Sequence, residues 1–138
     1  MFKSTFAISA IVILLSLSCS SSKETTNVLL HDIWALESIE GEKVTIDETI
    51  KNLPMLEIYV EEKRVHGNTS CNTINGKVNI DENKISFLEI ITTEMACPGN
   101  LEQRFLSALN KVNNYKIEKM KLYLFDDSTE LLVFKKID

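Results

Sequence analysis

Residues 100–112 read NLEQRFLSALNKV, and this stretch predicts one amphipathic helix in a chain otherwise made of short strand-like segments. Its apolar residues recur at the spacing of one helix face: Leu101, Phe105, Ala108, Leu109 and Val112. Asn100 is a favourable N-cap residue, with Gln103 three positions later as in a capping box. An apolar stripe of this length needs a partner that buries it. We therefore expect Phe105, at the middle of the stripe, to lie in the core.

Alternating apolar and polar residues on both sides of this helix predict a series of short strands. They are expected at residues 34–38, 43–46, 55–60, 63–70, 73–80, 85–91, 115–118, 121–125 and 131–134. Strands this close in sequence pair antiparallel, because parallel pairing needs long crossover connections. The fold class we predict is α+β: a strongly bent antiparallel sheet, a barrel-like meander, packed around the single helix.

Length and composition limit the possible classes of protein. The chain has 138 residues, room for one ordinary domain, and 44% of them are hydrophobic, which argues against wholesale disorder. It carries 15 basic and 20 acidic residues, a net charge of -5. A nucleic-acid-binding protein needs a basic face for the phosphates. We therefore expect no nucleic-acid partner.

The first residues are typical of a lipoprotein signal peptide. Lys3 precedes an uncharged run at residues 6–17, which is too short to span a bilayer and ends at Ser18-Cys19. We interpret residues 1–18 as a signal peptide and Cys19 as the lipidated N-terminus, although Ser16 stands where such sites usually have leucine. Ordinary secretion and an uncleaved anchor are the alternatives. Residues 19–31 would form the lipidated cysteine with a flexible tether, and residues 32–138 the domain.

A lipid on Cys19 would make the membrane the one partner that the sequence indicates. Two or three acyl chains hold a protein stably on a bilayer, whereas one chain holds it only marginally. Ser20 follows the cysteine in place of the aspartate that commonly signals inner-membrane retention, so the outer membrane is favoured. Whether the domain faces the periplasm or the exterior is left open.

The two remaining cysteines, Cys71 and Cys97, form an even pair in a compartment that favours oxidation. The predicted hairpin of residues 73–80 and 84–88 brings them close, with an offset of a few residues that a bulge or a bend at residues 94–97 could absorb. We expect a disulfide; two separate buried thiols are the alternative. On the chain-entropy estimate the bridge contributes about 3.5 kcal/mol.

Five segments in order resemble the META domain of HslJ-like envelope lipoproteins, over roughly residues 32–136. The central one, GNTSCNTING at residues 67–76, is similar to the family signature G-x-x-G-C-N-x-[FY]-x-G. Ser70 replaces the second glycine of that signature, and Ile74 replaces its aromatic residue. The other four begin at Trp34, Pro54, Thr93 (TEMAC, followed by Glu102, Phe105 and Leu109) and Leu122.

The resemblance implies a bent antiparallel sheet around one helix, association with the cell envelope and a part in stress responses. It does not imply an enzyme activity, and we expect no cofactor. The shared residues read as structural. Gly67 and Gly76 suit bulges or close backbone approach, Asn72 suits the bend after Cys71, and Glu102 suits the first helical turn.

A search for catalytic and metal motifs supports the same expectation. A zinc site from His66, Cys71 and Cys97 has suitable ligand types but no common spacing, and Cys71 with His66 as base would need a free thiolate. We therefore expect no enzyme and no metal. Two functions stay open: a non-catalytic envelope lipoprotein for stress tolerance or envelope integrity, or a binding module holding a peptide or lipid in an apolar groove between sheet and helix.

Overall fold

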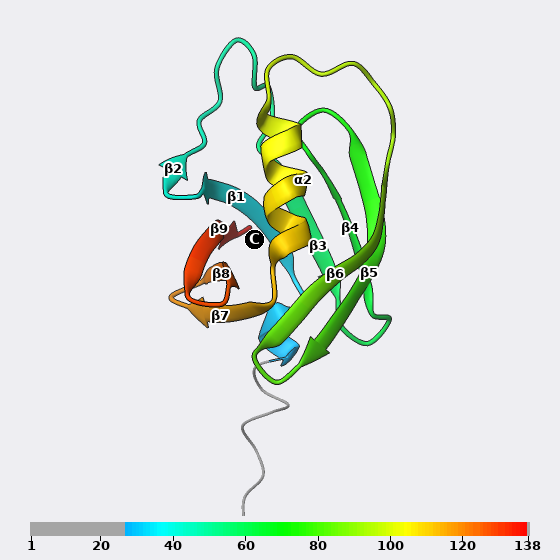
Figure 1. Cartoon of the computed structure of the whole chain (residues 1–138), viewed down its shortest axis with the longest axis vertical. Helices are drawn as coiled ribbons and strands as arrows, with labels where there is room; N and C mark the ends of the chain where they lie inside the picture. The colour runs from blue at the N-terminus through cyan, green and yellow to red at the C-terminus, as the bar shows by residue number, and fades with distance from the viewer. Residues whose placement is uncertain (1–26, 138) are drawn as a thin grey trace, which may run out of the picture.

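The computed structural model describes residues 27–137 (Figure 1). The predicted signal peptide, the lipidation site at Cys19 and most of the predicted tether therefore lie outside the described residues. Within that range the fold is α+β, as predicted. Its elements are β1 (Ile33–Ile39), β2 (Glu42–Lys43), β3 (Met55–Tyr59), β4 (Arg64–Asn68), β5 (Thr73–Asp81), β6 (Lys84–Thr92), α2 (Leu101–Lys111), β7 (Asn114–Glu118), β8 (Lys121–Asp126) and β9 (Thr129–Lys136).

The strands form one antiparallel sheet that bends into a ring. Their order is β2-β1-β3-β4-β5-β6-β7-β8-β9, and β1 also pairs with β9, so the two ends of the meander meet. The ladder is weakest between β6 and β7, where Lys84 and Asn114 are the one pair of partners. Helix α2 contacts β6, β9 and β1, and it lies along the ring beside this break (Figure 1). The bent sheet packed around a helix is confirmed.

The core fills the space between α2 and the sheet. Phe105 is 0% exposed, and its ring meets that of Phe134 edge-on, with centroids 6.3 Å apart. Ala108 and Leu109 of the same helix face are buried too. Trp34 is buried on β1, where its indole N–H donates to the carbonyl oxygen of Leu30 at 3.1 Å.

Three local details differ from the expectations. Strand β2 has only two residues, because the Oδ1 of Asp47 accepts the N–H groups of Thr49 and Ile50 and closes a local turn in place of a ladder. Residues 27–30, assigned to the tether, are helical, and Leu30 is fully buried. The Asn100 side chain makes no capping hydrogen bond, so the capping box is not formed.

The long axis of the domain separates two ends. The described chain begins at the lower end, beside the turn between β5 and β6 (Figure 1). Residues 44–54 and 93–100 form the upper end. None of the helices in the described part of the chain is long and apolar enough to cross a membrane.

Candidate functional site

A disulfide between Cys71 and Cys97 stands at the upper end, as predicted, with the two Cα atoms 5.9 Å apart. It joins the turn between β4 and β5 to the segment that follows β6. Part of the expected offset is absorbed earlier than residues 94–97. The β5–β6 register shifts between Asn75 and Lys77, and Glu89 opposite has φ +52. This bulge bends the hairpin before the ladder ends at Thr92.

Asn72 is the centre of a polar network beside the disulfide, and it is only 2% exposed. Its Oδ1 accepts the N–H of Met95 at 2.8 Å and the hydroxyl of Thr93 at 2.7 Å. Its Nδ2 donates to the Met95 carbonyl at 3.1 Å and to Glu102 Oε2 at 3.0 Å. The Asn72 side chain thus holds the segment that follows the end of β6 at Thr92. The sequence had indicated only a role at the bend after Cys71.

Glu102 ties this network to helix α2. The Thr69 hydroxyl donates to its carboxylate, and the Thr69 side-chain oxygen accepts the N–H of Asn72 at 2.9 Å. The carboxylate also stands in the first turn of α2, where the helix dipole favours negative charge. For Glu102, the sequence motif had indicated only a place in the first helical turn. The sequence analysis gave Thr69 and Thr93 no role, although they lie in the motif segments two positions before Cys71 and four positions before Cys97.

The backbone around the bridge is unusual at Ser70, which has φ +83. This left-handed conformation favours glycine, and it explains why the family signature has glycine there. Gly67 is required for a different reason: a Cβ on it would lie 2.0 Å from the Met55 carbonyl oxygen. A Cβ on Gly76 would lie 2.4 Å from the Ile90 side chain. Ile74, at the aromatic position, is fully buried.

Two adjoining clefts flank the disulfide, and Asn52, Ser70 and Cys71 line both of them. One has about 440 Å³ and extends toward Met55 and Ile137. The other has about 430 Å³ and is lined on its far side by residues that include Met95, Leu101 and Glu102. Residues 48–52 line the second cleft, and the Asp47 carboxylate closes their loop by accepting the N–H groups of Thr49 and Ile50. These two N–H groups hold the pKa of the Asp47 carboxyl below its usual value.

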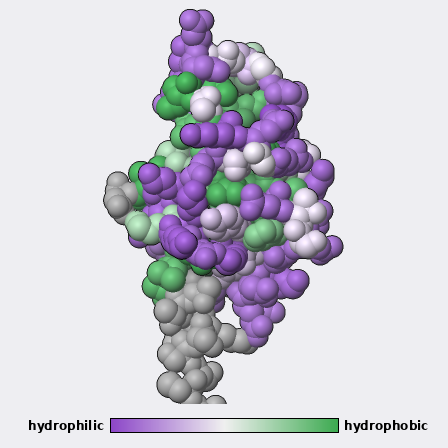
Figure 2. Space-filling model, turned by 90° about the vertical axis from the view of Figure 1, so that its left-hand side faces the viewer, coloured by the Kyte–Doolittle hydropathy of each residue, from purple (hydrophilic) through white to green (hydrophobic). Residues whose placement is uncertain are grey.

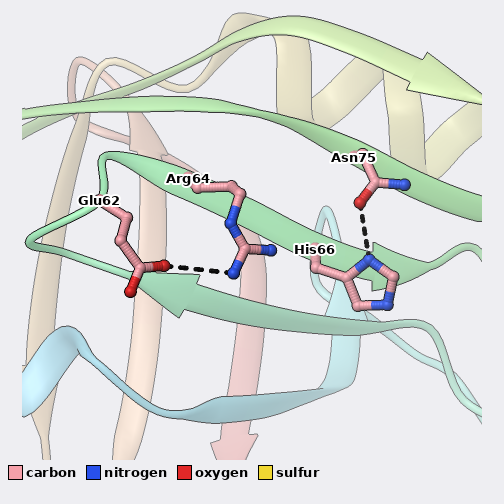
Figure 3. Close-up of polar contacts among 4 residues, drawn as sticks. All are labelled: Glu62, Arg64, His66 and Asn75. Carbon is pink, nitrogen blue, oxygen red and sulfur yellow. Dashed lines mark hydrogen bonds and ion pairs between the residues drawn. The ribbon is translucent and has the colours of Figure 1, made fainter.

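His66 lies on the exposed face of β4, where it bonds to Asn75 and not to either cysteine. Its Nδ1–H donates to the Asn75 Oδ1 at 2.8 Å, and Arg64 on the same strand pairs with Glu62 at 3.2 Å (Figure 3). The Arg64 guanidinium also covers the Tyr59 ring, 3.9 Å from its centroid. A hydrogen bond with Glu57 and partial burial raise the pKa of Tyr59.

The residues considered for metal or nucleophile chemistry are therefore not assembled as either hypothesis required. Cys71 and Cys97 are bonded to each other, while His66 bonds to Asn75. Among residues 27–137 no group of three His, Cys, Asp or Glu side chains is placed to hold a metal ion.

Comparison with known proteins identifies a family and similar folds. The family profile described as META domain matches residues 27–138. A search of curated protein sequences finds no match. Three solved structures are similar in fold. A protein from Burkholderia xenovorans, solved by NMR, is 17% identical, with a TM-score of 0.63 over 99% of this chain and 97% of its own.

A second protein solved by NMR is 22% identical, with a TM-score of 0.62 over 79% of this chain and 92% of its own. A DUF4847 family protein from Bacteroides vulgatus is 14% identical, with a TM-score of 0.58 over 83% of this chain and 99% of its own. At these identities the likeness shows a shared fold.

Proposed function

The chain belongs to the META domain family, and on that premise we propose that it is a non-catalytic domain displayed at the cell-envelope membrane by a lipid on Cys19. Its role is to support envelope integrity under stress, and its membrane is the outer membrane. The observation that carries this proposal is the packing beneath α2. Phe105, Ala108 and Leu109 are buried against the sheet, so side chains occupy the space that a ligand groove would need.

The residues shared with the family support the same role. Asn72 and Glu102 bind each other and hold the segment after β6. Gly67 and Gly76 allow strands to approach closely. Each of these four residues has a structural role, which supports a non-catalytic function for the domain. The Cys71–Cys97 bridge suits an oxidising compartment outside the cytoplasm.

Metabolic labelling with an alkyne fatty acid tests the anchor. The wild-type chain should take up the label and sediment with membranes, and Cys19→Ser should do neither. The matched control is the pair Cys71→Ser and Cys97→Ser, which removes two thiols and keeps the label. A Cys19→Ser protein that is labelled as strongly as wild type would refute the attachment site.

The role in stress is tested in a strain that lacks the gene. Survival under envelope stress (heat, detergent or oxidant) should fall, and the wild-type gene should restore it. The Cys19→Ser gene should restore less, because the domain is released from the membrane. Full restoration of survival by the Cys19→Ser gene would mean that the role in stress does not depend on the lipid anchor.

A binding module is the alternative. The groove expected between sheet and helix is the place where the core now lies, so this packing does not favour a peptide or lipid ligand there.

A further inference from the structure

Two large apolar side chains face solvent at the point where the described chain begins. Val28 is 70% exposed and Leu29 is 55% exposed. A cleft of about 610 Å³ beside them is lined by Val28, Val60 and His31, among others. Figure 2 shows hydrophobic surface at this lower end of the domain. We call Val28, Leu29 and Val60 the N-terminal apolar surface.

The position of this surface is held by the residues on either side of it. Leu30 is fully buried, and its carbonyl oxygen accepts the Trp34 indole N–H at 3.1 Å. The Tyr115 hydroxyl donates to the Asn27 Oδ1 at 3.2 Å. With Asn27 and Leu30 both held, Val28 and Leu29 cannot turn into the core. Their exposure is therefore a property of the folded domain.

The chain length between the lipid and this surface is short. Cys19 precedes Asn27 by eight positions. A fully extended chain of that length spans at most about 29 Å, and a flexible one has an r.m.s. length of about 16 Å. A lipid on Cys19 would keep the lower end within this distance of the bilayer. This step rests on the proposed function.

We propose that the N-terminal apolar surface contacts the lipid bilayer to which Cys19 anchors the chain. Apolar side chains at the headgroup boundary gain from burial there. Charge does not drive this contact: Glu61 lines the same cleft, and Asp32 is paired with Lys136 at 2.7 Å. A zwitterionic bilayer is therefore sufficient. The contact turns the disulfide end of the domain away from the membrane.

Two tryptophan variants of the full, lipidated chain test the contact: Leu29→Trp at the lower end, and Ile46→Trp as the matched control. Ile46 is 62% exposed and lines a cleft beside the disulfide at the upper end, while the native Trp34 is buried in the folded domain. The proteins are attached to vesicles of phosphatidylethanolamine and phosphatidylcholine with or without brominated chains. Quenching of Leu29→Trp should exceed that of Ile46→Trp by about twofold or more, because apolar residues at the interface sit about 5–10 Å deep.

Co-sedimentation with the vesicles separates the two possible failures. A lipidated chain that does not sediment refutes the anchor. A chain that sediments, with Leu29→Trp quenched no more than Ile46→Trp, refutes the contact alone.

Hydrogen exchange of the unaltered protein replaces the fluorescence if a tryptophan variant does not fold. Vesicles should slow exchange at residues 28–32 and leave residues 46–52 unchanged. Slowing at residues 28–32 that depends on protein concentration and not on vesicles would assign the surface to a second copy and overturn the proposal.

Discussion

The space beneath α2 and the upper end of the domain are held together by different means. Beneath α2, apolar side chains such as Phe105 and Phe134 pack against each other, and strand ladders surround them. At the upper end the β5–β6 ladder stops at Thr92, and a disulfide with the Asn72 side chain holds the next segment. Discrete polar and covalent contacts can therefore replace a ladder where backbone pairing ends.

The largest effect is expected from Phe105→Ala, which opens a cavity beneath α2. Truncating a buried phenylalanine costs about 3–5 kcal/mol of the free energy of unfolding. Urea denaturation measures the loss. Ser107→Ala on the exposed face of the same helix is the control and should stay within about 0.5 kcal/mol of wild type. Equal midpoints for Phe105→Ala and wild type would mean that α2 does not depend on this packing.

The second effect concerns the bridge of the upper end. Replacing both Cys71 and Cys97 by serine should lower stability by about 3.5 kcal/mol, because the unfolded chain loses a closed loop with a separation of 26 residues. The melting temperature should fall by about 10 °C or more, as calorimetry would show. Thiol titration of the native protein should find neither cysteine free. Two titratable thiols would contradict the bridge.

A smaller loss is expected from Asn72→Ala, which leaves the Met95 N–H without its acceptor. An unsatisfied buried polar group costs about 1–3 kcal/mol. Asn79→Ala, on an exposed position of the neighbouring β5, removes the same side chain without such partners and should be nearly neutral. If the two variants unfold at the same urea concentration, the Asn72 network does not stabilise the upper end.

Ser70→Gly should stabilise the upper end by about 0.5–1 kcal/mol. Glycine relieves the left-handed backbone at φ +83, which outweighs its greater freedom in the unfolded chain. The same change at Ser86, within β6, should instead destabilise the protein. Destabilisation by Ser70→Gly would show that the serine side chain matters more than its backbone.

The smallest effect is the acid sensitivity of the turn at Asp47. The Ile50 and Thr49 N–H groups lower the pKa of its carboxyl. Its contribution to stability is therefore present above the unfolded pKa and is lost as pH falls through the lower folded pKa. Between about pH 5 and pH 2, wild type should lose slightly more stability than Asp47→Asn. Parallel pH profiles of the two proteins would contradict this.

Periodicity predicted the sheet and α2, because both depend on local spacing and on the pairing of neighbouring strands. The even pair of cysteines, brought close by the expected hairpin, predicted the disulfide. The Asn72 network joins residues from the turn between β4 and β5, the 93–97 segment and α2, and such a convergence leaves no periodic signal. The short length of β2, two residues, could not be predicted from alternation either, since the Asp47 side chain competes with the ladder for backbone N–H groups. The glycine that the family signature has at position 70 is consistent with the positive φ of Ser70, but the sequence of this chain, with serine there, did not predict that conformation.

The central claim is that the upper end is held by its own contacts and not by the core beneath α2. Amide chemical shifts of the oxidised and reduced domain test it most directly. We expect the reduced protein to stay folded, since about 3.5 kcal/mol is less than the free energy of unfolding of most domains. Shift changes should be confined to residues 68–73 and 93–102, with α2 from Phe105 onward and the β1–β9 pairs unchanged. Loss of shift dispersion throughout the reduced protein would contradict the claim.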